Sequence, residues 1–268
     1  MKNLFDLSGK TVLLFGGSGI LGKEFTKALT DHQAHVVSCD IYDLSPELKL
    51  EGVDYQVVDA GNETELIEFR ERIIERYKKV DVIINAVTAK HNDFYLPFDE
   101  VSLEGWEIGL RGNLTVPFIV CKTFIRQLCE QGFGSIINIS SVYGLVGNDQ
   151  SIYEGSNLHE IYVKDSPEIT QIYSHGVYNA AKGGLNNFTR YLAAYYGKYN
   201  IRVNTISPGG IEYPQENETF LKKYGAKTPL GRKAKKDEIN GAVVFLASDA
   251  SSYVTGHNLV VDGGFTAW

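Results

Sequence analysis

Short apolar runs rich in β-branched residues alternate with helix-periodic stretches along nearly the whole chain, and this alternation restricts the possible folds most. The apolar runs cover residues 11–15, 34–39, 80–84, 134–140, 201–206 and 258–262. The helix-periodic stretches begin at Leu21 and then cover residues 66–74, 103–129, 178–199 and 239–247. Such alternation predicts an α/β fold, with a parallel sheet of about seven strands and helices packed on both faces.

Composition narrows the function class. The 268 residues carry 33 acidic and 26 basic side chains, a net charge of −7, and no basic block. Such a chain lacks the electrostatic footprint for nucleic acid and is repelled by anionic lipid. The polar N-terminus and the apolar runs, all shorter than about 18 residues, predict neither a signal peptide nor a membrane span. The three cysteines favour a reduced, cytoplasmic setting, and the six histidines show no metal-ligand spacing, so no metal is expected.

One stretch, residues 148–175, interrupts the alternation. It is polar and aromatic, with Tyr153, Tyr162 and Tyr173, and it has no clear period. A loop of this length inside a domain is usually functional or disordered. We therefore interpret residues 1–268 as a single domain with an insertion at 148–175.

A glycine-rich segment, Gly16-Gly17-Ser18-Gly19-Ile20-Leu21-Gly22, joins the first apolar run to the first helical stretch. Glycines at 16, 19 and 22 allow a tight turn, a close approach of the backbone to a pyrophosphate, and close packing of the helix on the sheet. The start of the following helix offers free N–H groups to phosphates. A plain tight turn is the alternative, but the strand–glycine–helix context favours a dinucleotide site.

Asp40 follows the second apolar run. A carboxylate at this position can accept hydrogen bonds from both ribose hydroxyls of an adenosine and would repel a 2′-phosphate. No arginine flanks Asp40, which removes the usual NADP anchor. NAD is therefore favoured over NADP, and a helix-capping or surface acid is the alternative.

Tyr178 and Lys182 stand one helical turn apart, so their side chains point to one region. A free phenol has a pKa near ~10, too high for efficient proton transfer at neutral pH. A nearby cation favours the phenolate and lowers that pKa. The pair therefore predicts a general acid/base, although this spacing alone is common by chance.

Together these residues resemble the short-chain dehydrogenase/reductase family, in its single-domain branch, over nearly all of the chain. The resemblance is carried by the 16–22 segment, Asp59, Asn85-Ala86, Asn113, Ser140-Ser141, Tyr178-x-x-x-Lys182, Pro208-Gly209-Gly210-Ile211, Val254-Thr255-Gly256 and Val261-Asp262-Gly263-Gly264. It implies a doubly wound, Rossmann-type sheet, NAD(P)-dependent oxidoreductase activity and a homodimer or homotetramer. The chain is also loosely similar to members from bacterial surface-sugar biosynthesis.

The resemblance implies roles for single positions. Tyr178 would exchange a proton with the substrate oxygen, and Ser141 would hydrogen-bond that oxygen. Lys182 would hold the nicotinamide ribose and tune Tyr178, and Asn113 would fix a water in the proton relay. The implied cofactor contacts are Gly16, Ser18, Gly19, Ile20, Leu21, Gly22, Asp40, Ile41, Asp59 (adenine), Ala60, Asn85 and Ala86 (ribose), Tyr178, Lys182, and Pro208, Gly209 and Ile211 (carboxamide).

Some positions depart from the family pattern. Phe15 stands where a threonine usually precedes the first glycine, and Ile84-Asn85-Ala86-Val87 replaces the usual Asn-Asn-Ala-Gly. The largest departure is the insertion, which makes the interval between Ser141 and Tyr178 much longer than usual. Both side chains can still meet, because lengthening a loop adds little closure entropy.

The insertion would lie beside the reacting centre, as part of the substrate pocket or of a subunit contact. Its acids outnumber its bases, with Asp149, Glu154, Glu160, Asp165 and Glu168 against Lys164. Acids and tyrosines suit a hydroxyl-rich or amine-bearing substrate such as a sugar, and argue against a polyanion unless the basic stretch near Lys222-Lys223 faces the site. A solvated surface loop is the alternative.

The sequence therefore predicts an NAD-preferring oxidoreductase that acts on a secondary alcohol or ketone, of a sugar or amino-sugar derivative. A 3-oxoacyl-thioester reductase is the alternative among enzymes, against which the acidic insertion and Asp40 argue. A non-catalytic dinucleotide sensor is the alternative outside enzymes, and it would have no use for a tuned phenol.

Overall fold

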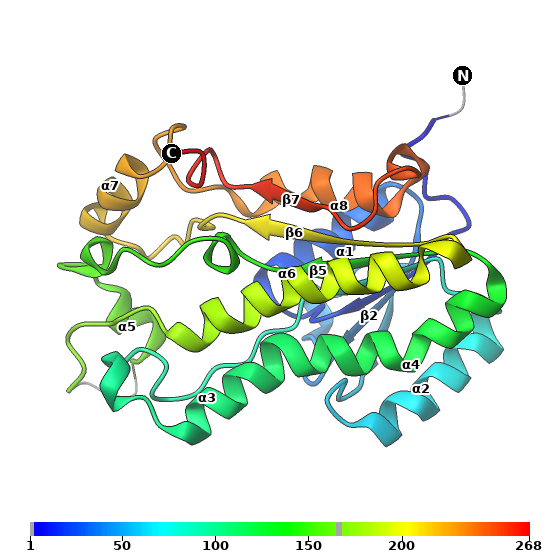
Figure 1. Ribbon diagram of the computed structural model, residues 1–268, viewed down its shortest axis with the longest axis horizontal. Helices are drawn as coiled ribbons and strands as arrows, with labels where there is room; N and C mark the ends of the chain where they lie inside the picture. Colours follow the sequence, from blue (N-terminus) through cyan, green and yellow to red (C-terminus); the bar gives the residue numbers. More distant parts are fainter. Residues whose placement is uncertain (1–2, 165–167) are drawn as a thin grey trace.

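A seven-stranded, all-parallel sheet forms the centre of the computed structural model, which describes residues 3–164 and 168–268 (Figure 1). The strand order is β3-β2-β1-β4-β5-β6-β7, and every neighbouring pair is parallel. The strands are β1 (Thr11–Phe15), β2 (His35–Asp40), β3 (Asp54–Val57), β4 (Val82–Asn85), β5 (Gly134–Ile139), β6 (Ile201–Pro208) and β7 (Asn258–Val261). The order reverses between β1 and β4, which opens a crevice at their carboxyl ends.

Eight α-helices accompany the strands in the described residues. They are α1 (Ile20–Asp31), α2 (Glu63–Tyr77), α3 (Leu103–Leu110), α4 (Val116–Gln131), α5 (Leu158–Tyr162), α6 (Gly176–Tyr196), α7 (Glu218–Ala226) and α8 (Asn240–Ala247). The expected α/β architecture, a doubly wound Rossmann-type sheet, is confirmed.

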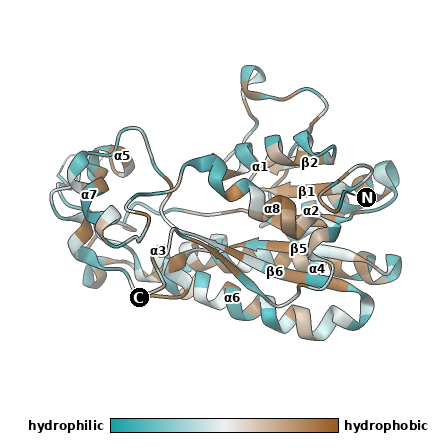
Figure 2. Ribbon diagram, turned by 90° about the horizontal axis from the view of Figure 1, so that it is seen from above, coloured by the Kyte–Doolittle hydropathy of each residue, from teal (hydrophilic) through white to brown (hydrophobic). Residues whose placement is uncertain are grey.

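Alternating strand residues serve two separate cores. In β1, Leu13 and Phe15 pack with buried residues of α2, α4 and α6, whereas Val12 and Leu14 pack with buried residues of α1 and α8. Side chains that alternate across a strand point to opposite faces, so the continuous apolar runs reflect burial on both faces. Figure 2 shows the hydrophobic residues gathered along the strands at the centre.

The helical stretch expected over 103–129, as two helices or one bent helix, is α3 and α4 joined by a π-helical turn, Arg111–Thr115. By length and composition alone, the joined helix Leu103–Gln131 could cross a membrane, unlike the expectation from the apolar runs. In the structure, 56% of its apolar window is buried inside the protein, with Val120 and Phe124 in the core beneath the sheet. It therefore resembles the core helix of a globular domain.

A third apolar cluster lies beyond the carboxyl ends of the strands. Phe94, Tyr153, Leu158, Val177 and Phe220 belong to it, and they come from segments far apart in the sequence. Figures 1 and 2 both show α5 and α7 together at this end of the molecule, beside the start of α6. The strand β3 and the helices α5 and α7 were not expected. β3 and α5 are too short to show a hydrophobic period, whereas the apolar face of α7, with Phe220 and Tyr224 one turn apart, was overlooked.

Candidate active site

The glycine segment forms a tight loop between β1 and α1. Gly16 has a φ of 89°, and a Cβ there would lie 2.6 Å from the Ala86 carbonyl oxygen. A Cβ on Gly22 would lie 2.1 Å from the Gly16 carbonyl oxygen. The N–H groups of Gly16 and Gly17 donate to the Cys39 carbonyl at 2.9 and 3.0 Å, which ties the loop to β2. Within α1, no side chain caps the N-terminus and no acid occupies the first turn, so its amides are available to a phosphate.

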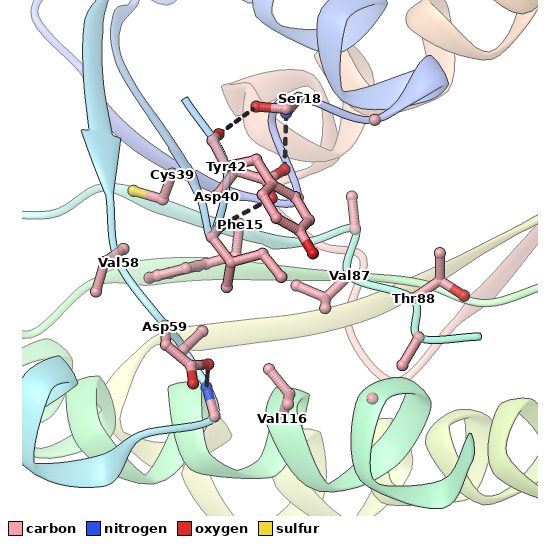
Figure 3. A pocket seen from close by; sticks show the side chains of 18 of the residues that line it. Phe15, Ser18, Cys39, Asp40, Tyr42, Val58, Asp59, Val87, Thr88 and Val116 are labelled. Carbon is pink, nitrogen blue, oxygen red and sulfur yellow. Dashed lines mark hydrogen bonds between the residues drawn. The ribbon is translucent and has the colours of Figure 1, made fainter. Parts of the chain in front are cut away.

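The loop opens onto a cavity of about 420 Å³, here called the glycine-loop cavity (Figure 3). Its lining residues are Phe15, Gly16, Ser18, Gly19, Cys39, Asp40, Ile41, Tyr42, Val58, Asp59, Ala60, Gly61, Ala86, Val87, Thr88, Ala89, Ile108, Arg111, Gly112 and Val116. Eight predicted cofactor contacts are among them: Gly16, Ser18, Gly19, Asp40, Ile41, Asp59, Ala60 and Ala86.

Asp40 and Asp59 lie along this cavity (Figure 3). One Asp40 oxygen accepts from the Ser18 N–H at 2.9 Å, and the other accepts from the Ile41 N–H at 2.8 Å. Because a carboxylate has about four acceptor sites, Asp40 can still accept from two further donors. Asp59 accepts from the Gly61 N–H at 2.8 Å. Both acids are thus held in place by backbone amides.

Other predicted contacts lie elsewhere. Ile20 and Ile211 line a second cavity, described below, and Gly209 lines a small hollow next to it. Leu21, Gly22, Asn85 and Pro208 line none of these three. The Asn85 amide instead donates to Asn138 Oδ1 at 2.8 Å inside the core, because β4 and β5 pair side by side there.

The predicted catalytic residues come together at the start of α6 and the end of β5. The Lys182 ammonium donates to the Ile139 carbonyl at 2.8 Å, and its Nζ lies 5.5 Å from the centre of the Tyr178 ring. The Ser141 side chain hydrogen-bonds Tyr178 and also accepts from the Tyr143 N–H at 3.2 Å. Ser141 and Lys182 are buried.

The electrostatics of this group depart from the expectation of a lowered phenol pKa. Burial raises the pKa of Tyr178, and the hydrogen bond from the Ser141 side chain opposes that rise. Burial lowers the pKa of Lys182 to about 8. Desolvation disfavours the charged form of each group and is the largest cause of both shifts.

Asn113 lies in the π-helical turn between α3 and α4, fully buried. Its Oδ1 accepts from the Thr88 hydroxyl at 3.0 Å and its Nδ2 donates to the Gly109 carbonyl at 3.0 Å. Such turns are frequent at functional sites. Thr88 lines the glycine-loop cavity, so Asn113 is linked to that cavity through one hydrogen bond.

A second cavity of about 290 Å³ contains Tyr178 and is here called the tyrosine cavity. Its lining residues are Ile20, Tyr95, Tyr143, Tyr153, Leu158, Tyr162, Ile172, Tyr173, Ser174, His175, Tyr178, Gly210, Ile211, Tyr213, Glu216, Phe220, Tyr224 and Lys233. Ile20, which follows Gly19 of the loop, lies in its wall. The two cavities are therefore neighbours at the start of α1.

The insertion contributes aromatic rings and not acids to this cavity. Tyr153, Tyr162 and Tyr173 line it, whereas none of its described acids does. Asp149 instead pairs with Lys227 at 2.7 Å, and Glu154 pairs with Lys223 at 3.6 Å. The idea that insertion acids face the substrate is thus wrong for the described residues, because lysines in and just after α7 take two of them; Asp165 lies outside the described residues.

Sequence reasoning missed several lining residues. His175 stacks on Phe94 with ring centres 4.7 Å apart and lies 5.3 Å from the Tyr178 ring. Burial, and the charge of Lys90, lower the pKa of His175 to about 4, so the ring is neutral at physiological pH. Glu216 and Lys233 form a buried ion pair. His175 ends the insertion that was expected near the reacting centre, although nothing singled out its ring. Glu216 and Lys233 lie in segments without a motif or a period, so no sequence signal pointed to them.

Metal binding has no support in the described part of the chain. Across residues 3–164 and 168–268, no group of three or more His, Cys, Asp or Glu side chains could hold a metal ion.

Family models match both halves of the chain. The family model described as short chain dehydrogenase matches residues 10–156. A second model, described as enoyl-(acyl carrier protein) reductase, matches residues 166–266.

Curated relatives match along almost their full length. A 2,5-dichloro-2,5-cyclohexadiene-1,4-diol dehydrogenase of Sphingobium indicum is 32% identical, over 98% of this chain and 99% of the relative. A 3-oxoacyl-[acyl-carrier-protein] reductase FabG of Thermotoga maritima is 31% identical, over 96% of this chain and 98% of the relative. Among solved structures, a short chain dehydrogenase from Leptospira borgpetersenii with bound NAD+ has a TM-score of 0.86 and 33% identity, over 99% of this chain and 96% of that one.

Proposed function

The chain belongs to the short-chain dehydrogenase/reductase family, and from that premise we propose an NAD(H)-dependent oxidoreductase that interconverts a secondary alcohol and a ketone of a sugar or a similar hydroxylated ring. One observation carries the proposal. Tyr178, with Ser141 hydrogen-bonded to it and Lys182 behind it, lines a cavity that adjoins the glycine loop.

The glycine loop fits a dinucleotide. Side chains at Gly16 or Gly22 would collide with backbone, and the first amides of α1 are free of side-chain caps. A pyrophosphate at this position would accept from those amides. Asp40 retains acceptor capacity for ribose hydroxyls and would repel a 2′-phosphate, which supports NAD over NADP. When bound, the nicotinamide would supply or accept the hydride.

Tyr178 provides the proton. Its raised pKa keeps the phenol protonated at neutral pH, ready to protonate a ketone oxygen as the alcohol forms. In the opposite direction the phenolate must take the alcohol proton, and the Lys182 ammonium stabilises that phenolate. Because the Lys182 pKa is about 8, the ammonium is present at neutral pH.

Ser141 and Asn113 orient this chemistry. The Ser141 hydroxyl, next to the phenol, would donate to the substrate oxygen and fix its position. The Lys182 ammonium has three donors, of which one is used by the Ile139 carbonyl. We assign the others to the nicotinamide ribose and to a water held near Asn113, through which the proton is replenished.

We also propose a reduced, cytoplasmic setting and a homodimer or homotetramer. Cys39, Cys121 and Cys129 all carry free thiols, which supports a reducing compartment. Phe118 of α4 and Tyr191 and Tyr195 of α6 are exposed, which supports burial of these helices against a second copy.

The FabG relative favours a second candidate, reduction of a 3-oxoacyl thioester. An absorbance screen for NAD(H) turnover separates the two. The substrates are sugars, amino sugars, polyols, cyclohexanols and 3-oxoacyl thioesters, each assayed with NAD(H) and with NADP(H). Our proposal expects the highest kcat/KM for a hydroxylated ring with NAD(H). Turnover restricted to thioesters with NADPH would contradict it.

A further inference from the structure

Glu216 and Lys233 form an ion pair in the wall of the tyrosine cavity. Their side chains are 1% and 6% exposed, and they are the only carboxylate and the only ammonium among the described residues that line this cavity. Neither belongs to a motif of the family, and neither takes part in the chemistry assigned to Tyr178.

The pair is set among aromatic rings. Lys233 Nζ lies 4.9 Å from the centre of the Phe220 ring and 5.6 Å from that of Tyr224. One Glu216 oxygen accepts from Lys233, and the other accepts from the Tyr213 N–H at 3.1 Å. The other nearby cation, exposed Lys90, lies over the Tyr162 ring and does not line the cavity. Glu212, which does not line the cavity, also acts electrostatically on Lys233, so the charges of the pair balance each other only within the cavity lining.

Aromatic contacts separate this pair from Tyr178. Phe220 stacks on Tyr153 at 5.8 Å, and the Tyr153 hydroxyl lies 3.3 Å from that of Tyr143, which follows Ser141 closely. On another side, Tyr162 stacks on Tyr95 at 5.4 Å. The cavity therefore has a reacting end at Tyr178, aromatic walls, and an ionic end at Glu216 and Lys233.

The ionic end has unused hydrogen-bonding capacity. The Lys233 ammonium has three N–H donors, one of which donates to Glu216. The Glu216 carboxylate has about four acceptor sites, two of which are occupied. A buried ion pair adds little stability compared with apolar residues of the same size. Because stability does not explain why this pair is buried, we infer that the pair binds a ligand.

We propose that Glu216 and Lys233 determine substrate specificity by anchoring an uncharged cyclic polyol at the hydroxyl remote from the reacting carbon. That hydroxyl donates to Glu216 and accepts from Lys233, while the rings of Tyr153 and Phe220 lie along the carbon skeleton. A remote carboxylate would face Glu216, and a remote ammonium would face Lys233. The inference rests on the proposed function, narrows its substrate class, and excludes sugars with a free amine or a carboxylate at that position.

Four ring alcohols test it: cyclohexanol, trans-cyclohexane-1,4-diol, trans-4-aminocyclohexanol and trans-4-hydroxycyclohexanecarboxylate. They differ only in the group opposite the reacting hydroxyl. With the full chain and NAD+, kcat/KM for the diol should exceed that of the other three by roughly tenfold or more, the worth of a charge-assisted hydrogen bond. The difference should lie in KM and not in kcat. Equal values for all four would overturn the proposal.

Charge-changing variants sharpen the test. Glu216→Gln leaves Lys233 unpaired and should move the preference to the carboxylate, whereas Lys233→Gln should move it to the amine. The double variant Glu216→Gln/Lys233→Gln restores neutrality and guards against misfolding caused by one buried charge. It should lose most of the diol preference, and a wild-type preference in it would overturn the proposal. Lys222→Gln, on the exposed face of α7, is the control and should keep the wild-type order.

Ligand-induced shifts of Tm in the presence of NADH separate this inference from the proposed function. Selective stabilisation by the diol without any turnover would reject the oxidoreductase assignment and keep the anchor. Turnover with an unchanged preference in Glu216→Gln would reject the anchor and keep the oxidoreductase. If the protein shows no turnover and the diol does not stabilise it selectively, both the oxidoreductase assignment and the anchor are overturned.

Discussion

Asp40 combines two functions at the edge of the glycine-loop cavity. It accepts from the Ser18 N–H at 2.9 Å, which holds the loop, and under the proposed function its negative charge would repel the 2′-phosphate of NADP. The first function needs an acceptor, whereas the second needs a charge. Substitutions can therefore separate them.

We predict that Asp40→Asn raises the ratio of kcat/KM for NADP+ to that for NAD+ by roughly tenfold or more, since like charges placed together cost several kcal/mol. The asparagine oxygen can still accept from the Ser18 N–H and hold the loop, whereas the acceptor for the Ile41 N–H is lost. Asp40→Ala should also raise this ratio, but it should weaken the binding of both cofactors. Asp43→Ala removes a carboxylate paired with Lys49 on the surface and is the control. An unchanged ratio in Asp40→Asn would remove the role given to this residue.

Single residues were predicted best where a motif imposes them. Ser141, Tyr178 and Lys182 lie together, and eight of the residues predicted to contact the cofactor line one cavity, although their roles stay predictions. Electrostatics were predicted worse. The phenol pKa at Tyr178 is raised and not lowered, because the sequence reveals the neighbouring cation but not the degree of burial.

At the scale of elements, the loop between β1 and α1 depends on the absence of two side chains. A Cβ at Gly22 would lie 2.1 Å from the Gly16 carbonyl, and the obstacle is backbone, which cannot rotate away. Any side chain at Gly22 should therefore push α1 away from β1.

We predict that Gly22→Ala lowers the free energy of unfolding by about 1–3 kcal/mol, the usual cost of overpacking, and weakens NADH binding. Gly241→Ala is the matched control, because a Cβ at Gly241 in α8 meets no atom within 4 Å. It should stabilise the protein by about 0.5–1 kcal/mol, since alanine favours helix, and leave NADH binding unchanged. Urea unfolding and fluorescence titration measure both quantities. NADH affinity equal to wild type in Gly22→Ala would refute the role of this contact.

The sequence predicted those elements whose period is strong. The buried strands β1 and β4 carry short apolar runs, β5 is rich in isoleucine, and α6 carries a clear apolar face. Strand β3 lies at the sheet edge, is half-exposed and reads Asp-Tyr-Gln-Val, so it carries no such signal. The short helix α5 is only five residues long, too short for periodicity to be visible.

For the whole molecule, the glycine-loop cavity lies where the topology predicts a ligand. The strand order reverses between β1 and β4, and the glycine-loop cavity takes lining residues from the carboxyl ends of both. The tyrosine cavity instead combines the insertion, the segment around Tyr95 and the region around α7. A motif fixes the first arrangement, whereas long-range packing of aromatic residues creates the second. The insertion could therefore be placed near the substrate from the sequence, but its partners Tyr95, Glu216 and Lys233 could not.

The central claim is that the Tyr178 phenol exchanges a proton with the substrate beside a bound dinucleotide. Tyr178→Phe removes one oxygen and keeps the ring, and the decisive measurement is its kcat alongside its affinity for NADH. Loss of general acid/base catalysis should lower kcat by roughly 10²–10⁴-fold or more, with NADH affinity within a few-fold of wild type. A variant that turns over at the wild-type rate would contradict the account.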